Sequence, residues 1–400
     1  MKEEMLGKYA DALGVELQNL LYWWKTFAVD HERGGFYGEV QNDNLPLKDR
    51  PKGLVLNSRI LWTFSSAYLL NHVPDDLLMA KRAFECLCDF FYDHRHGGFY
   101  WSVDAEGNQL DGKKQIYGQA FAIYGLSEYF KATNDTRALN LAEETFRRIE
   151  QYSLDPIHEG YTEAFSTDWS PVDDLRLSEK DLNTAKSMNT HLHIIEAYAN
   201  LYTIWGDMRL GGALKKLLKV FKTHLIGSDF HQQLFFSKNW EPQSAIISYG
   251  HDIEAAWLLQ ACAESLGDEE EINTFKRLAI AMTDAVMDGI DSDGGMYYEY
   301  NPERGLLVRE KHWWPQAEAM IGFFNAYELS GNKMYLTRSM DSWNFVKETL
   351  RDGQNGEWYW GIHADGSLMP GSKAGFWKCP YHNGRACMEL IKRMNDAWRI

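Results

Sequence analysis

Apolar residues recur at helical spacing along most of the chain. Between residues 3 and 27 they follow one another at steps of three or four, the period of an α-helix; they are Leu6, Tyr9, Leu13, Leu17, Leu20 and Trp24. A second helix, which carries Arg59 and Trp62, is predicted to begin near Asn57. The glycine-rich segment from Asp30 to Gly38 lies between them and is predicted to form a turn and a short strand.

Short polar breaks divide the rest of the chain. Each break ends one apolar helix and opens the next, and it places an Asp or Asn where an N-cap would accept backbone N–H groups. The breaks are Pro74-Asp75-Asp76, Asn134-Asp135, Gly206-Asp207, Gly267-Asp268 and Gly331-Asn332. Their last residues are separated by 59, 72, 61 and 64 residues. An internal period of this kind indicates a repeat architecture.

A second series of turns, made of glycine and aromatic residues, falls between these breaks. The series consists of Gly34–Tyr37, Gly97–Tyr100, Glu159–Tyr161, Leu234–Phe236, Gly294–Tyr297 and Gly356–Tyr359. Hairpin-forming residues follow several of them, as at Asp104–Gly107 and Asp365–Gly366. The predicted repeat unit is therefore a helix, a long loop with a small hairpin, a second helix and a short turn.

Six such units give twelve helices, which can close on themselves as a double ring. We predict an all-α fold, an (α/α)6 barrel of twelve helices with short β-hairpins in the long loops. An open helical solenoid is the alternative. Against it, the even-numbered helices carry apolar or aromatic residues on most faces, which is typical of a buried inner ring. No linker interrupts the pattern, so residues 1–400 are predicted to form a single domain.

Charge and cysteine content narrow the possible partners. The chain has 41 Lys and Arg against 57 Asp and Glu, a formal net charge of −16. Because phosphate groups bind to basic surfaces, neither nucleic acid nor an anionic membrane is an expected partner. No apolar run approaches the length of a membrane span, and the acidic Met1–Met5 segment does not resemble a secretory signal. Five scattered cysteines fit reduced thiols and a cytoplasmic location.

Residues able to carry chemistry gather near the beginnings of the six predicted inner helices. These helices are expected to begin near Asn57, Gln115, Lys186, Tyr249, Trp313 and Pro380. The candidates within their first two turns are Arg59, Tyr117, Asn189 with His193, His251 with Glu254, Trp314 with Glu318, and His382. In a closed ring these helix starts converge on one mouth. Their N-termini suit an intermediate that becomes an anion.

Each candidate also has a plainer interpretation. The histidines could be core residues, and His251 with Glu254 could be a surface pair or half of a metal site. The segment lacks the second histidine of a zinc-binding motif, so no metal is expected. Glu254 and Glu318 could be a glycosidase carboxylate pair. His191 and His193 are two residues apart and cannot share a helix face, so only one is expected to point inward.

Six motifs, in order along the chain, carry a resemblance to a known family. They are Asn57–Trp62, Tyr117–Phe121, Lys186–His193, Tyr249–Ala255, Trp313–Glu318 and Phe376–Arg385. Together they resemble the N-acylglucosamine 2-epimerase superfamily, and within it the branch that acts on disaccharides. The resemblance covers essentially the whole chain and implies an (α/α)6 barrel, in agreement with the repeat count.

The resemblance implies an acid/base role for three histidines. His251 and His382 would exchange protons with C2 of a reducing sugar, and His193 would assist opening of the sugar ring. A C2 proton is acidic only in the open-chain aldehyde, so ring opening would come first. One imidazole would then remove the C2 proton to give a cis-enediolate, and the other would return a proton on the opposite face. The ordinary pKa of histidine, about 6.5, suits both steps at neutral pH.

Eight further residues are implied to hold or orient the substrate. They are Arg59, Tyr117, Asp181, Asn189, Glu254, Trp314, Glu318 and Trp377. The two tryptophans would stack on sugar rings, while Asp181 would reach the second sugar. The two glutamates would orient or tune the histidines.

The implied reaction is epimerisation at C2 of the reducing-end glucose of β-1,4-linked disaccharides, with cellobiose and lactose as expected substrates. No cofactor is expected, because no electrons leave the substrate. A small-molecule disaccharide is the expected partner, and the chain is expected to be a monomer or a weak homodimer. The alternatives are a mannose or N-acylglucosamine 2-epimerase or an aldose–ketose isomerase of the same superfamily, a glycoside hydrolase, and a non-catalytic sugar-binding protein.

Overall fold

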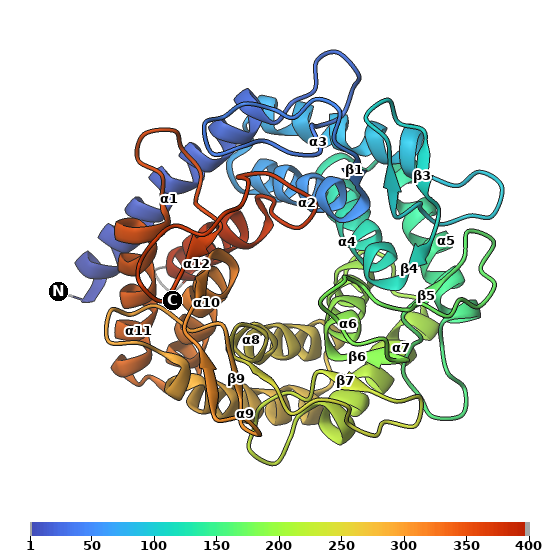
Figure 1. Ribbon diagram of the computed structural model, residues 1–400. Coiled ribbons are helices and arrows are strands. Elements are labelled where there is room, and N and C mark those ends of the chain that lie inside the picture. The colour runs from blue at the N-terminus through green and yellow to red at the C-terminus, as the bar shows by residue number, and fades with distance from the viewer. Residues whose placement is uncertain (1, 397–400) are drawn as a thin grey trace.

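Twelve α-helices form two concentric rings in residues 2–396, the part of the chain that the computed structural model describes (Figure 1). The inner ring consists of α2 (Leu54–Asn71), α4 (Ile116–Thr133), α6 (Met188–Tyr202), α8 (Tyr249–Leu266), α10 (Trp313–Ser330) and α12 (Tyr381–Asp396). The outer ring consists of α1 (Lys2–Phe27), α3 (Pro74–Cys86), α5 (Thr136–Tyr152), α7 (Met208–Val220), α9 (Glu269–Ala285) and α11 (Lys333–Phe345). Each inner helix packs against the next, and α12 packs against α2. The ring is therefore closed, and the predicted (α/α)6 barrel is confirmed.

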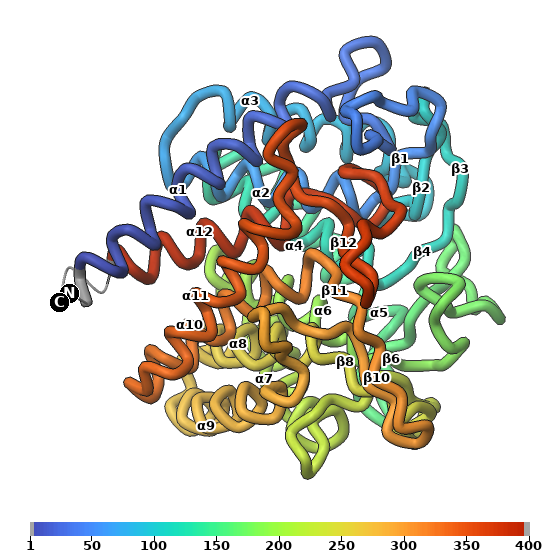
Figure 2. Tube along the Cα trace, turned by 60° about the vertical axis from the view of Figure 1, so that its left-hand side comes forward, coloured from blue at the N-terminus to red at the C-terminus, as the bar shows by residue number. Residues whose placement is uncertain are grey.

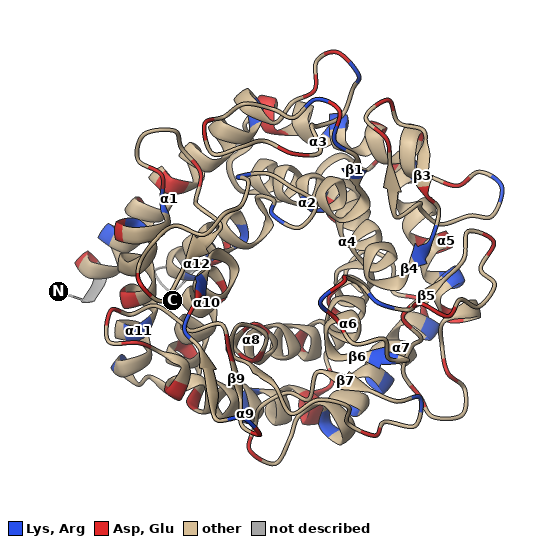
Figure 3. Cartoon of the chain, viewed as in Figure 1, with Lys and Arg blue, Asp and Glu red and all other residues tan. Residues whose placement is uncertain are grey.

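The two rings differ in how much of each helix is buried. Every residue from Leu54 to Ala67 of α2 is buried, because two inner neighbours and the outer ring enclose the helix. In α5 of the outer ring, by contrast, only one face is buried. Charged residues are accordingly concentrated on the outer helices and loops (Figure 3). Within residues 2–396, no helix combines the length and the apolar character that crossing a membrane requires.

The predicted N-caps are confirmed at four of the five polar breaks. The capping side chains, each of which accepts a backbone N–H group in the first helical turn, are Asp135, Asp207, Asp268 and Asn332. The prediction is wrong at the first break, where Val73 stands at the N-cap of α3 and Pro74 is the first helical residue. Proline suits that position because it has no N–H to satisfy. Asp76 instead accepts a hydrogen bond from Lys25 of α1 at 2.9 Å.

Short strands lie at the end of the barrel where the inner helices begin (Figure 2). They are β1 (Lys52–Gly53), β2 (Ser102–Val103), β3 (Gln109–Asp111), β4 (Lys114–Gln115), β5 (Ala164–Phe165), β6 (Lys186–Ser187), β7 (Phe235–Phe236), β8 (Ile247–Ser248), β9 (Glu299–Asn301), β10 (Leu306–Val308), β11 (Lys311–His312) and β12 (Gly361–Ile362). Hairpins in the long loops were predicted, and β2–β3 and β9–β10 form them. The strands that directly precede inner helices pair with the following loop. These pairings join neighbouring repeats around the mouth.

Lysine–aspartate pairs, buried in four of five cases, fix most of these loops to the barrel. The pairs are Lys52–Asp30, Lys114–Asp93, Lys186–Asp155, Lys311–Asp291 and Lys373–Asp352. Each aspartate directly follows an outer helix and its terminal turn, and four of the lysines stand two residues before an inner helix. Removing one partner of a buried ion pair strongly destabilises the fold, because the other charge is left buried and unpaired. The pairs therefore hold the loops, and with them the starts of the inner helices, in place.

Candidate active site

A cavity of about 760 Å³ lies where the inner helices begin, a size typical of small-molecule sites. Ten of the eleven predicted site residues line it: Arg59, Tyr117, Asp181, Asn189, His193, His251, Glu254, Trp314, Trp377 and His382. Glu318 is the exception, because it is fully buried behind His382 and reaches the cavity only through that histidine. The loop from Leu175 to Leu182 completes the wall and carries Asp181.

Two histidines from distant parts of the sequence meet at this cavity. His251 stands in the first turn of α8, and His382 stands in the first turn of α12. The Trp314 ring contacts both imidazoles, with ring centroids 4.6 Å from His251 and 5.7 Å from His382. The Nδ1 atom of His251 is hydrogen-bonded to Ser248 Oγ at 2.8 Å. Both Nδ1 atoms are thus engaged, since that of His382 is bound to Glu318.

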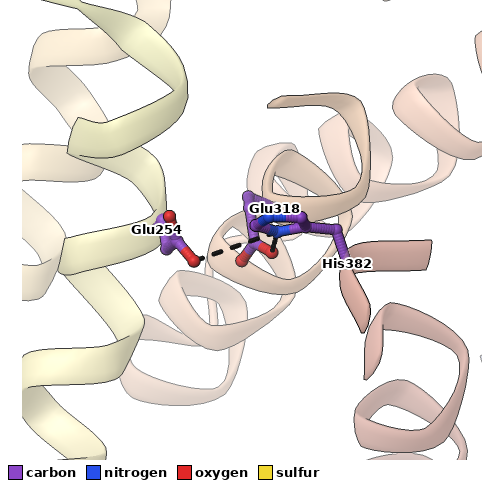
Figure 4. A group of neighbouring side chains, drawn as sticks. All are labelled: Glu254, Glu318 and His382. Atoms are coloured by element: carbon purple, nitrogen blue, oxygen red, sulfur yellow. Dashed lines mark hydrogen bonds and ion pairs between the residues drawn. The ribbon is translucent and has the colours of Figure 1, made fainter. Parts of the chain in front are cut away.

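Glu318 holds His382 from behind (Figure 4). Its Oε1 atom lies 2.7 Å from His382 Nδ1, and its Oε2 atom accepts a hydrogen bond of 3.0 Å from Trp257 Nε1. A carboxylate in this position fixes the ring and its tautomer, and it stabilises the imidazolium that forms when His382 takes up a proton. Glu318 therefore contacts His382 rather than the cavity, and its role in orienting or tuning that histidine stays a prediction.

Arg385 joins the carboxylates of this site, and the sequence analysis gave it no role. Its Nη2 atom donates 2.7 Å hydrogen bonds to Glu254 and to Glu318, and its Nη1 atom donates to Glu196. Arg385 follows His382 by three residues on α12, so the two side chains share a helix face. This three-residue spacing was the feature of the sequence that could have pointed to Arg385 as a site residue. The carboxylates that Arg385 joins could be identified only once the ring had closed.

The carboxylates of this cluster could in principle hold a metal ion. Glu254, Glu318 and His382 each offer a ligand atom, and these atoms lie within 4.8 Å of one another. However, Arg385 Nη2 already donates hydrogen bonds to Oε1 of Glu254 and to Oε1 of Glu318. A guanidinium group therefore occupies the space between the two carboxylates, and the residues present do not fit a metal ion.

Burial changes the charge of both histidines. Burial lowers the pKa of His251 to about 3, and the neighbouring His193 and His382 add to the effect. Burial likewise lowers the pKa of His382 to about 3, although Glu318 opposes the shift. Both imidazoles are therefore neutral at neutral pH and each retains an unprotonated nitrogen. The ordinary pKa assumed from the sequence does not apply to either of them.

The three carboxylates differ in charge although all are buried. Burial would raise the pKa of Glu318 and of Glu196, but Arg385 and the bonded histidines outweigh it, so both remain ionised. Burial and the nearby Glu318 charge raise the pKa of Glu254 well above its usual range, against the opposing effect of Arg385. Glu254 therefore keeps its proton at neutral pH and offers the cavity a neutral carboxylic acid.

His193 and His191 point in different directions, as their spacing predicted. His193 lines the cavity, and its Nδ1 atom lies 2.8 Å from Glu196 Oε2. His191 instead bonds to the backbone of Ser187 and Tyr161 in the adjoining loops. His193 therefore has a carboxylate partner, in the same way as His382.

Arg59 and Asn189, which line the cavity, each have a buried polar atom without a hydrogen-bond partner among the described residues. Arg59 donates from Nη2 to Tyr117 Oη at 2.8 Å, and its guanidinium group stacks on Phe121 and Tyr381. Its Nε atom, like Asn189 Oδ1, has no hydrogen-bond partner among the described residues. Unpaired buried polar atoms are rare in folded proteins, and at a cavity wall they are typical of ligand contacts.

The sequence as a whole matches a known family. The profile of the N-acylglucosamine 2-epimerase (GlcNAc 2-epimerase) family matches residues 35–386. The chain belongs to this family. The resemblance stated from six motifs is thereby confirmed, and so is the predicted enzyme class, an epimerase.

Several relatives of this member of the family are cellobiose 2-epimerases. The Bacteroides fragilis enzyme is 47% identical over 376 residues, which cover 93% of this chain and 95% of that protein. The Dictyoglomus turgidum enzyme is 38% identical, over 94% of this chain and 96% of that protein. The solved structure of the Spirochaeta thermophila enzyme matches with a TM-score of 0.91 at 38% identity, over 99% of this chain and 98% of that one.

Proposed function

We propose that the chain epimerises C2 of the reducing-end glucose in β-1,4-linked disaccharides, converting cellobiose to 4-O-β-D-glucosyl-D-mannose and lactose to epilactose. One observation carries the proposal: two imidazoles, those of His251 and His382, line one cavity and both contact the Trp314 ring. Several relatives of similar length and 36% to 47% identity are cellobiose 2-epimerases, which supports the choice of disaccharide.

The first step is opening of the sugar ring. His193 assists it by moving a proton between the C1 hydroxyl and the ring oxygen, and Glu196 stabilises the imidazolium that this transfer creates. The open-chain aldehyde then makes the proton on C2 acidic. Asn189, whose Oδ1 atom has no partner within the described chain, can accept a hydrogen bond from a sugar hydroxyl.

The second step is proton exchange at C2. One histidine, as the neutral imidazole, removes the C2 proton; the other, which has first taken up a proton from solvent, delivers that proton as an imidazolium to the other face of the enediolate. Glu318 stabilises the protonated form of His382, whereas Ser248 offers His251 only a neutral hydroxyl. Each histidine acts as base in one direction of the reversible reaction.

The enediolate oxygen needs fixed hydrogen-bond donors. The unpartnered Nε–H of Arg59 and the N-termini of the inner helices supply positive potential at the cavity wall. A donor of this kind is worth on the order of 3 kcal/mol of transition-state stabilisation. The chain's own residues thus provide the charge that the intermediate requires.

The geometry of the two glutamates disfavours a glycoside hydrolase. A glycosidase holds its two carboxyl groups on either side of the scissile bond, separated by about 5 to 9.5 Å. Here one nitrogen of Arg385 bonds to both Glu254 and Glu318, and Glu318 does not line the cavity. No glycosidic oxygen can lie between the two carboxyl groups.

Product analysis tests the proposed function. The purified protein is incubated separately with cellobiose, mannose and N-acetylglucosamine, and the products are separated. The proposal predicts glucosyl-mannose from cellobiose and no free glucose. Conversion of only mannose or only N-acetylglucosamine would assign the chain to another activity of its superfamily, and release of glucose would favour hydrolysis.

We further propose a cytoplasmic enzyme that acts as a monomer or a weak homodimer. All five cysteines are free thiols, which suits a reducing compartment. The cavity is lined by helices and loops of this chain, which fits a site that one subunit forms by itself. Size-exclusion chromatography over a range of concentrations tests the oligomeric state.

A further inference from the structure

In four of the six inner helices, the side chain of the fourth residue accepts a hydrogen bond from the preceding loop. In α4 and α10 this residue is Gln119 and Gln316, and in α6 it is His191. Each side chain accepts a hydrogen bond from the backbone N–H of a residue in the glycine–aromatic turn of the preceding loop. In α8 the equivalent residue is Asp252, which accepts the N–H of Gln232 at 2.8 Å. Asp252 is fully buried, so the repeat that carries His251 places a carboxylate where the others place a neutral group.

The same repeat lacks the lysine–aspartate pair found in the others. Lysine stands two residues before α2, α4, α6 and α10, but Ile247 stands two residues before α8. The aspartate partner is also missing. After each outer helix, one residue forms an isolated β-bridge with the following turn. The next residue is Asp93, Asp155 or Asp291 in other repeats, but it is Gly227 in this one. Both members of the pair are therefore absent together.

A different cation serves this repeat. His231 occupies the position that is glycine at residues 98, 160 and 295, as shown by the hydrogen bond from the Gly227 N–H to the His231 carbonyl oxygen. The Nδ1 atom of His231 lies 2.7 Å from Asp252 Oδ2. Among the described residues, no lysine or arginine pairs with Asp252.

The His231–Asp252 pair adjoins the histidine on which the proposed function depends. Asp252 directly follows His251, and Gln232, the neighbour of His231, donates from Nε2 to the His251 carbonyl oxygen at 2.9 Å. We propose that His231 is a positioning residue: as a cation paired with Asp252, it fixes the first turn of α8 and thereby the direction of the His251 imidazole. This inference rests on the proposed function and adds a residue outside the cavity to it.

The surroundings of His231 favour its charged form. Asp252 faces it from α8, Asp229 from its own loop, and Asp288 from the turn Val286–Gly289 after α9; the Tyr249 ring packs against it. Burial alone would lower the pKa of His231, but these carboxylates outweigh it, and the pKa lies above its usual value. Unlike the lysines, this cation loses its charge as pH rises above neutrality. The stabilisation is present between the pKa of Asp252, which burial raises, and the pKa of His231, and it disappears as pH rises through the latter.

The substitution His231→Asn tests the proposal. The Asn amide can keep a hydrogen bond to Asp252 but carries no charge at any pH. At about pH 6, kcat for cellobiose should fall about ten-fold, with KM within about two-fold, because a charge-assisted bond to the helix that carries His251 is lost. As pH rises through the pKa of His231, the two proteins should converge, because the wild-type imidazole then becomes neutral as well. The difference in melting temperature should shrink over the same pH range.

His158→Asn provides the matched control. His158 lies 3.2 Å from Asp155 in the preceding repeat, but Asp155 also pairs with Lys186 and so keeps a cation. This variant should match the wild type in kcat at every pH. A loss as large as that of His231→Asn would mean that any loop histidine matters, and it would overturn the specific role of His231.

A double-mutant cycle with Asp252→Asn separates the pair from general damage to the loop. In the Asp252→Asn variant, the further substitution His231→Asn should cause no additional loss of kcat, because the carboxylate that His231 pairs with is already gone. Additive effects, or a rate ratio that does not change with pH, would overturn the proposal. A wild type that fails to epimerise would instead contradict the proposed function, and the melting temperatures, which need no turnover, would still test the ion pair.

Discussion

Replacing Glu318 by glutamine probes how the buried carboxylate supports proton transfer. Glu318 Oε1 accepts from His382 Nδ1 and Arg385 Nη2, while Oε2 accepts from Trp257 Nε1. The new amide has one acceptor and one donor end. Whichever way it lies, its NH2 group faces at least one N–H donor, and the negative charge beside His382 is gone.

The size of the effect follows from the geometry. When His382 takes up the C2 proton, its positive charge lies beside the Glu318 carboxylate, with Nδ1 2.7 Å from Oε1. At a charge separation of about 4 Å and an effective dielectric constant of about 20, the attraction is about 4 kcal/mol. A hydrogen bond to a neutral acceptor returns about 1 kcal/mol of this. The net loss of about 3 kcal/mol corresponds to about a hundred-fold lower kcat.

The assay is the steady-state rate of cellobiose epimerisation by Glu318→Gln. KM should stay within about two-fold of the wild-type value, because Glu318 does not line the cavity. The control is Glu16→Gln, since Glu16 is another buried glutamate that accepts a tryptophan N–H, from Trp358 at 2.7 Å, away from the cavity. The control should lose stability but keep its kcat. A Glu318→Gln variant with kcat within about three-fold of the wild type would refute the reasoning.

Further predictions concern the neighbouring charges. The raised pKa of Glu254 means that the folded chain holds a proton which the unfolded chain releases near the ordinary value of 4.5, so wild-type stability falls as pH rises above it. Glu254→Gln should therefore gain in unfolding free energy relative to the wild type between about pH 5 and pH 8; a pH-independent difference in urea denaturation would contradict this. Lys114→Met leaves Asp93 as an unpaired buried charge and should lower the unfolding free energy, measured by urea denaturation, by about 3 to 5 kcal/mol. Dialysis against a chelator should leave the rate unaltered, because Arg385 fills the space between the two glutamates; a loss that added metal restores would overturn that view.

The ring of helices could be predicted from the sequence because the signals that define each repeat lie within that repeat. Apolar spacing, capping residues at Asp135 or Asp207, and glycine–aromatic turns depend on residues that are neighbours in the chain. The starts of the inner helices were predicted within a few residues, with α2 beginning three residues early, at Leu54. The strand pairings between neighbouring repeats were not predicted, because two-residue strands have no periodicity to detect.

The residues that face the cavity could be predicted from the sequence. The charged residues packed behind them could not. His251 and His382 stand out because polar residues at the start of apolar helices need an explanation. Arg385 does not stand out, because its partners Glu196, Glu254 and Glu318 lie on three other helices and meet it only in the closed ring. The pKa of each histidine was equally inaccessible, since it depends on burial and on charges contributed by distant segments.

The central claim is that two imidazoles exchange a proton with C2 of the substrate. Its most direct test is to convert cellobiose in D2O and to measure deuterium at C2 of the glucosyl-mannose formed. The account predicts one deuterium at C2 of this product. Glucosyl-mannose that carries only protium at C2 would contradict it.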